Sequence, residues 1–205
     1  MRKRLIGGIA AGVALIATTV IAGTASAAPL AWNVARDDGG TSGEFTGVAG
    51  VTVLTTASGI ELTCDSATAA GTANLGTGVA NPIATLPPDS TKFLNCTGPF
   101  GLTFEVTHVG TWELHGDSYA SDVTTGRITN IEADISGPAC EATVTGSVNA
   151  TFTNPSNELA VLPAQTLTVS TVDPANDCLG LISQGEAAGF SGTFVVSPGL
   201  TVTGS

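Results

Sequence analysis

The chain of 205 residues carries 17 carboxylates and six basic side chains, which gives a formal net charge of −11. Such an acidic surface repels nucleic acid and anionic lipid head groups, and this excludes both as expected partners. The length is sufficient for one hydrophobic core and short for two independent ones.

Residues 1–27 have the three parts of a secretory signal peptide. Residues 2–4 are basic, a long apolar run follows, and Ala25-Ser26-Ala27 offers a small-residue cleavage site. The run is nearly long enough for an uncleaved membrane anchor, but the cleavage site favours export. Cleavage leaves three basic residues against 17 carboxylates, a net charge of −14. We therefore expect a secreted, extracellular protein, at most loosely associated with the cell envelope, with no integral membrane segment after cleavage.

Residues 28–43 are polar and glycine-rich and are predicted to form a flexible N-terminal lead-in, followed by a single β domain over residues 44–205. In that domain apolar and polar residues alternate with period two, as in antiparallel strands with one buried face. The clearest run is 140–153, CEATVTGSVNATFT, whose even positions are apolar or small and whose odd positions are polar. The same alternation occurs at 60–64, 94–96, 102–107, 130–135 and 190–196.

Turn-forming residues separate these runs, and no segment shows sustained helical periodicity. Roughly nine to eleven short strands at this spacing predict an all-β fold, either an antiparallel β-sandwich or a flattened barrel. The runs 100–108 and 112–120 flank Val109-Gly110-Thr111 and predict a hairpin with a three-residue loop.

The stretch LHGDSYAS, residues 114–121, contains a His, an Asp and a Ser, and Gly-Asp-Ser opens the nucleophile block of a class of serine esterases. A serine nucleophile needs its base within hydrogen-bond reach. A regular strand places Leu114, Gly116 and Ser118 on one face, and His115 on the opposite one. The stretch is therefore predicted to be a strand and not an active site.

The four cysteines are Cys64, Cys96, Cys140 and Cys178, which in an exported chain predict two disulfides. Three pairings are possible. We favour Cys64–Cys96 with Cys140–Cys178, because each bridge then joins one half of the domain. The spacing contains no C-x-x-C and no His lies near a Cys, so a zinc site is not expected. No cofactor is expected either.

The remaining candidates are ionisable side chains on polar strand faces. Glu113, His115 and Asp117 share one face and could bind a metal weakly, whereas Glu132 and Asp134 lie two apart on another strand. Paired carboxylates across a cleft perform glycoside hydrolysis, but the two Trp and one Tyr of this chain are few for a sugar platform. We interpret the five as a weak candidate polar face, and predict no catalytic residue and no metal site.

Five runs resemble a group of small exported proteins from high-GC Gram-positive bacteria. They are LTC (62–64), LNCTGPFGLTFEVT (94–107), ISGPACEATVTG (135–146), CLGLI (178–182) and FSGTFVVSP (190–198). The resemblance spans most of the chain after the signal peptide, and the four cysteines anchor it. It implies a secreted β-rich domain with two disulfides and no established activity.

These observations favour a non-catalytic secreted or envelope-associated β-domain, monomeric, with an extracellular partner or ligand that the sequence does not identify. Two alternatives stay open. One is a small secreted hydrolase, namely a carboxylate-based glycosidase. The other is an extracellular ligand-binding or inhibitor domain that presents loops from a disulfide-stapled scaffold.

Overall fold

The computed structural model describes residues 30–164 and 166–204, and the predicted signal peptide lies outside them. The described residues contain three short 3₁₀ turns, η1 (Pro99–Gly101), η2 (Asn154–Ser156) and η3 (Cys178–Gly180). They contain no helix long and apolar enough to cross a membrane. Their strands, fifteen in all, are β1 (Trp32–Arg36), β2 (Glu44–Ala49), β3 (Thr52–Thr56), β4 (Glu61–Ala73), β5 (Gly76–Val79), β6 (Ala84–Leu86), β7 (Thr91–Thr97), β8 (Thr103–Val109), β9 (Trp112–Ala120), β10 (Val123–Gly137), β11 (Cys140–Thr153), β12 (Glu158–Val161), β13 (Leu167–Asp177), β14 (Ala187–Ser197) and β15 (Leu200–Gly204).

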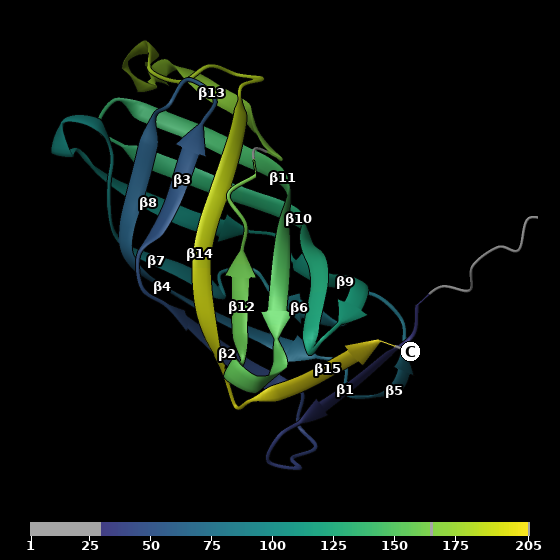
Figure 1. Ribbon diagram of the computed structural model, residues 1–205. Helices are drawn as coiled ribbons and strands as arrows, with labels where there is room; N and C mark the ends of the chain where they lie inside the picture. Colours follow the sequence, from purple (N-terminus) through teal and green to yellow (C-terminus); the bar gives the residue numbers. More distant parts are fainter. Residues whose placement is uncertain (1–29, 165, 205) are drawn as a thin grey trace, which may run out of the picture.

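The predicted all-β class is confirmed, and the architecture is a closed antiparallel barrel of eight strands with extra strands at one end (Figure 1). Four barrel strands are continuous: β4, β10, β11 and β14. Each of the other four consists of two shorter strands that lie end to end: β2–β3, β6–β7, β8–β9 and β12–β13. Each barrel strand pairs with the next one in the chain, and β14 pairs back onto β2 and β3. This is an up-and-down barrel, in which closure removes the sheet edges.

The divided barrel strands explain why the strand count differs from the predicted nine to eleven. The predicted hairpin of 100–108 with 112–120 is wrong for the same reason. β8 and β9 both pair with β10, β8 with residues 132–136 and β9 with residues 123–129, so they lie end to end. Gly110 has φ of 70°, a conformation that glycine adopts readily in a bend as well as in a reversal. Val109-Gly110-Thr111 therefore forms a bend between β8 and β9, after which the chain continues in the same direction.

The barrel interior is the hydrophobic core, and strand alternation determines which residues enter it. On β11 every even-numbered residue from Cys140 to Phe152 is buried except Gly146, as the alternation predicts. Gly146 has φ of 137° and lies where the pairing with β10 shifts by one residue. The extra residue is on β10, where Thr129 and Asn130 together oppose Ser147, so the β-bulge belongs to β10 and Gly146 lies beside it.

The predicted disulfide pairing is confirmed. Cys64 and Cys96 are directly opposite each other on β4 and β7, and Cys140 at the start of β11 is bonded to Cys178 just after β13. All four cysteines are buried. Both bridges lie at the same end of the barrel, where the connections β3–β4, β7–β8, β10–β11 and β13–β14 gather. We call this the disulfide end. Two structural disulfides are typical of an oxidising, extracytoplasmic environment.

The opposite end is covered by a separate three-stranded sheet in the order β15-β1-β5 (Figure 1). This finding corrects the predicted flexible lead-in over residues 28–43, because β1 lies within it. Trp32 on β1 has no exposed surface, and Val34 is also buried. The lead-in is ordered because these two side chains close the barrel and because β1 pairs with both β5 and β15.

Close packing under this sheet depends on a glycine. A Cβ atom at Gly116 of β9 would overlap the ring of Trp32. We expect Gly116→Ala to lower the free energy of unfolding by about 1–3 kcal/mol through overpacking, measured by urea denaturation. Gly50→Ala is the matched control, since a Cβ at Gly50 meets no atom within 4 Å. Equal urea midpoints for the two variants would contradict the assigned contact.

Candidate binding site at the disulfide end of the barrel

The polar residues singled out from the sequence form separate pairs and not one site. His115 Nε2 lies 3.2 Å from Glu113 Oε2 on the outer face of β9. Asp117 accepts a hydrogen bond from the guanidinium of Arg127 on β10. Among the described residues, no group of three or more His, Cys, Asp or Glu side chains is placed to hold a metal ion.

The two carboxylates on β10 have different surroundings. Asp134 accepts a 2.7 Å hydrogen bond from the hydroxyl of Thr143, and Glu132 is exposed. Asp134, Glu141 and Asp173 line a groove of about 490 Å³ on the barrel wall, whose lining contains no aromatic side chain. Because glycosidase clefts hold sugars on aromatic rings, this groove gives the carboxylates no platform for a substrate.

The stretch LHGDSYAS is confirmed as a strand, but its register differs from the prediction. The pairing of β9 with β10 shifts so that Gly116 faces Gly126 and Ser118 faces Thr125. This bulge turns Ser118 to the exposed side, so the expectation that it shares a face with Leu114 is wrong. The alternation of apolar and polar residues does not reveal where a bulge interrupts a strand. The imidazole of His115 pairs with the Glu113 carboxylate. It therefore does not act as a base for Ser118.

The buried histidine of the chain, His108, is part of the core. The Thr91 backbone N–H donates to its Nδ1 at 3.2 Å, and its ring lies on that of Trp112 with centroids 3.9 Å apart. Burial lowers the pKa of His108, which favours the neutral imidazole. These contacts describe a packed structural side chain.

The interior of the barrel is packed rather than hollow. Cavities of about 60, 50 and 40 Å³ lie within the described residues of the barrel, all lined mainly by apolar side chains. Pockets for small-molecule ligands usually measure roughly 300–1,000 Å³. A barrel of eight strands is just wide enough for side chains to fill it. The interior therefore provides stability and not a ligand chamber.

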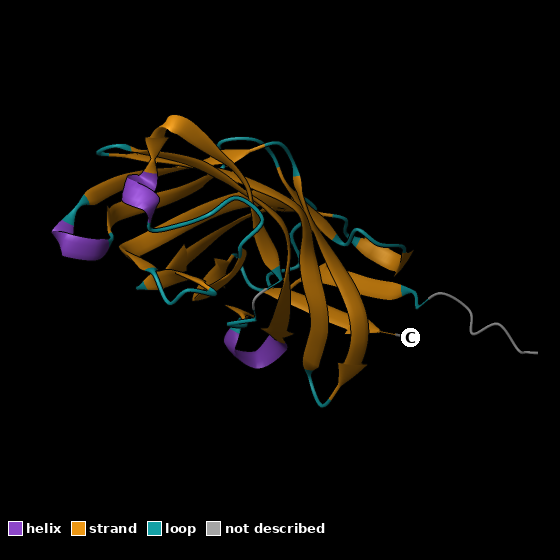
Figure 2. Ribbon diagram, turned by 90° about the horizontal axis from the view of Figure 1, so that it is seen from above, coloured by secondary structure: helices purple, strands orange, loops and turns teal. Residues whose placement is uncertain are grey.

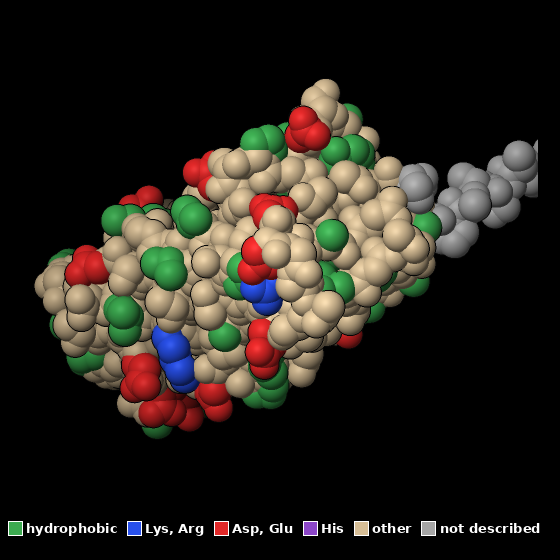
Figure 3. Space-filling view, turned by 90° about the horizontal axis from the view of Figure 1, so that it is seen from below, with side chains coloured by type: hydrophobic (Ala, Val, Ile, Leu, Met, Phe, Trp, Pro, Cys, Tyr) green, Lys and Arg blue, Asp and Glu red, His purple; other side chains and the backbone are tan. Residues whose placement is uncertain are grey.

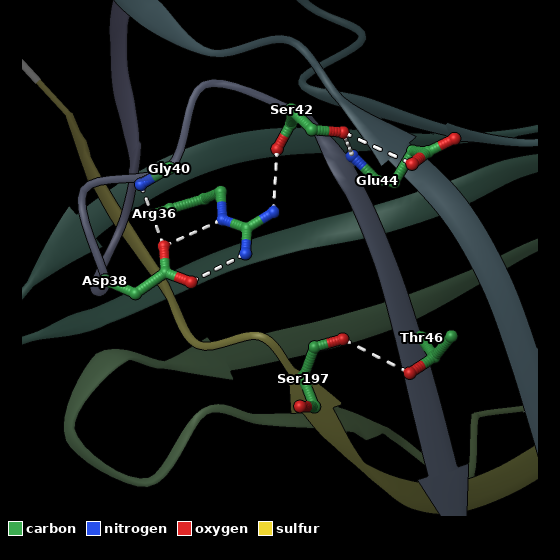
Figure 4. A network of polar contacts seen from close by, with 7 residues as sticks. All are labelled: Arg36, Asp38, Gly40, Ser42, Glu44, Thr46 and Ser197. Atoms are coloured by element: carbon green, nitrogen blue, oxygen red, sulfur yellow. Dashed lines mark hydrogen bonds and ion pairs between the residues drawn. The ribbon is translucent and has the colours of Figure 1, made fainter.

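A second outer groove, of about 710 Å³, lies near the three-stranded sheet and includes Arg36. Its guanidinium is held within the chain (Figure 4): Nε and an Nη donate to the Asp38 carboxylate at 2.9 and 2.6 Å, and the other Nη donates to the carbonyl of Ser42 at 3.1 Å. The bonds from Arg36, with one from the Gly40 N–H, lower the pKa of Asp38 to about 2. Arg36 thus orders the β1–β2 loop.

At the disulfide end, two loop tips expose apolar side chains. Phe100 is 85% exposed and Leu179 is 56% exposed. Each lies in one of the 3₁₀ turns η1 and η3, which are close together at this end in Figure 2. On the face of the barrel shown in Figure 3, apolar side chains are scattered in small groups among backbone, carboxylates and other side chains.

The two turns have the same local geometry. Leu102 N–H donates to the carbonyl of Pro99 at 3.2 Å, and Leu181 N–H donates to that of Cys178 at 3.0 Å. In the first turn Phe100 and Gly101 have φ of 61° and 71°. In the second, the corresponding residues Leu179 and Gly180 have φ of 58° and 68°. Positive φ at both central positions defines a type I′ turn, for which Asn-Gly is the favoured sequence.

Placing Phe and Leu in these turns is unfavourable for the backbone. A bulky side chain in the left-handed region costs of order 1 kcal/mol or more, and neither residue is buried in the core in return. Each turn is fixed beside a disulfide, since Cys96 lies four residues before Phe100 and Cys178 immediately precedes Leu179. The chain therefore holds two apolar side chains outward at rigid positions.

The two turns belong to one surface. Pro99 and Leu102 of the first turn, and Leu179 and Leu181 of the second, line the same cavity of about 50 Å³ beneath the loops. The Glu186 carboxylate joins the β3–β4 and β13–β14 connections beside the turns. It accepts hydrogen bonds from the N–H of Ser58 at 2.7 Å and from the N–H of Ser183 at 3.1 Å. The bonds involving Ser58 lower the pKa of Glu186. We call Phe100 and Leu179 with their turns the tip pair.

Sequence reasoning missed the tip pair because it assigns apolar residues to the core. The signal that marks it is a repeated pattern, an apolar residue followed by Gly-Leu close to a cysteine, at 100–102 and 179–181. No family model, curated protein or solved structure matches the chain. The candidate site therefore rests on its geometry.

Proposed function

We propose that the protein is a non-catalytic, exported binding domain that engages an extracellular partner through the tip pair. The observation that carries this proposal is the exposure of Phe100 and Leu179 in turns whose backbone disfavours them. A sequence under selection for stability alone would have Asn or Gly at these two positions. Strained, exposed apolar residues at these positions support a role in contacts outside the molecule.

The scaffold suits such a role. Aromatic and large aliphatic side chains that fill a pocket of the partner contribute most of the energy of protein interfaces. Side chains held in a fixed conformation lose less entropy on binding than those on mobile loops. The closed barrel and the two disulfides hold the tip pair in this way. The separate pairing of Glu113 with His115 and of Asp117 with Arg127 supports a non-catalytic role.

A double variant, Phe100→Asn with Leu179→Asn, tests the proposal without threatening the fold. Asn fits a left-handed turn position, so we expect the free energy of unfolding to stay the same or to rise by about 1 kcal/mol per turn. Binding should fall at least tenfold, because the apolar contacts are lost. The measurements are urea denaturation and the retention of partners by immobilised protein from the medium and envelope fraction of the exporting cells.

The matched control is Val48→Thr with Val195→Thr. These valines face each other across β2 and β14 on the barrel wall and are also exposed. The control should bind as the wild type does. If the double Asn variant retains the same partners as strongly as the wild type, the tip pair is not the binding site and the proposal fails.

A further inference from the structure

We infer that the partner of the tip pair is a basic polypeptide surface with apolar hollows that receive Phe100 and Leu179. This inference rests on the proposed function and adds the chemistry of the partner. It is carried by the charges around the tip pair and by its convex shape.

The disulfide end is uniformly acidic. Its four connections, taken with the adjoining strand ends, are residues 57–61, 97–105, 136–141 and 173–186, and they contain no Lys, Arg or His. They contain six carboxylates: Glu61, Glu105, Glu141, Asp173, Asp177 and Glu186. The basic residues of the described chain lie elsewhere: Arg36 on β1, Lys92 within β7 and Arg127 on β10. No positive charge therefore offsets the field of these carboxylates at the tip pair.

Most of these carboxylates are free to act on a partner. Glu61, Glu105, Glu141 and Asp177 are exposed, whereas Glu186 is used to join two loops. Asp177 is the Cα neighbour of Cys140 across β13 and β11, so it and Glu141 flank the disulfide beside Leu179. At physiological ionic strength charges act over about 8 Å. Carboxylates within that range of an apolar contact attract a basic partner and repel an acidic one.

Shape decides what kind of basic partner fits. A side chain that is 85% exposed at the apex of a turn is a projection, and the cavity below the turns, about 50 Å³, is too small to receive a ligand. The partner must therefore supply the hollows. A lipid surface is disfavoured because anionic head groups would be repelled. Lys and Arg side chains around an apolar depression on a polypeptide satisfy both requirements.

The test uses exported protein with both disulfides formed and a defined probe, an amphipathic helical peptide composed of Lys and Leu. A second peptide with Glu in place of every Lys keeps the apolar face and reverses the charge. Titration calorimetry should show binding of the Lys peptide that weakens as salt is raised, and at least tenfold weaker binding of the Glu peptide. Equal affinities for the two peptides would overturn the inference.

Variants locate the interaction on the molecule. Glu141→Gln with Asp177→Asn should weaken binding of the Lys peptide about fivefold or more and reduce its salt dependence. Glu44→Gln with Glu158→Gln, at the opposite end of the barrel, makes the same change in net charge and should leave the affinity within twofold. Equal losses in the two double variants would mean that the peptide responds only to net charge, and the inference would fail.

The outcomes separate the two proposals. If Phe100→Asn with Leu179→Asn abolishes binding while the Glu141 and Asp177 variant binds normally, the tip pair stands and the basic partner is wrong. If the Asn variant binds the Lys peptide normally, the peptide does not contact the tip pair and this inference is lost. Vesicles of phosphatidylcholine or phosphatidylglycerol should bind at least tenfold more weakly than the Lys peptide, and comparable binding would overturn the choice of a polypeptide.

Discussion

Replacing Trp32 by alanine is expected to lower the free energy of unfolding by about 3–5 kcal/mol. The indole ring has no exposed surface, and it packs closely over Gly116 of β9. Its strand joins β15 on one side and β5 on the other, so the empty space would open where the two ends of the described chain close the barrel. Urea denaturation followed by tryptophan fluorescence measures the loss, with Trp112 as the remaining reporter.

Leu30→Ala is the control for this experiment, because Leu30 lies two residues away and is exposed. Its effect should stay within about 0.5 kcal/mol. A wild-type unfolding midpoint for Trp32→Ala would show that the three-stranded sheet is not part of the cooperative unit, and that the barrel is stable with this end open.

Removing the Cys140–Cys178 disulfide, by changing both cysteines to alanine, should lower the free energy of unfolding by about 3–4 kcal/mol. The bridge closes a loop with a sequence separation of 38, and the unfolded chain gains the corresponding entropy when it is cut. The loss also releases the turn that holds Leu179. We therefore expect weaker binding at the tip pair in addition to a lower melting temperature, measured by differential scanning calorimetry and titration of the Lys peptide.

The other disulfide provides the comparison. Cys64–Cys96 has a sequence separation of 32, so its removal should cost a similar free energy. It should leave the Leu179 turn in place and loosen the β7 end that leads to Phe100. If both double alanine variants unfold at the wild-type temperature, the bridges do not contribute the expected stability.

Local sequence pattern was sufficient where a strand is buried on one face only. The alternation from Cys140 to Phe152 predicted the inward face of β11, and the same alternation identified the inward side of β10 around Ile131 and Ile135. The expectation that each bridge joins one half of the domain led to the correct cysteine pairing. These features depend on neighbours within a strand or on a choice among three pairings, so a single sequence contains the necessary information.

Other features depend on contacts that are distant in sequence or on the backbone. Closure of the barrel joins β14 to β2, about 150 residues earlier, and no local pattern reports that pairing. β1 is short and is followed by glycines, and it becomes a strand only because Trp32 finds space above Gly116. The bulge in β9 reversed the expected orientation of Ser118. Phe100 and Leu179 are apolar like core residues, and their positive φ angles and exposure, which the repeated Gly-Leu pattern alone does not reveal, distinguish them.

The pairing of β1 with β15 fixes the direction in which the molecule faces. Trp32 is opposite Gly204, so the two ends of the described chain lie side by side at the end of the barrel away from the disulfides (Figure 1). A dye, affinity tag or surface linker joined to either end would therefore leave Phe100 and Leu179 pointing away from the support. Two molecules joined through such ends would present their tip pairs in opposite directions, so the fusion could bind two partners at once.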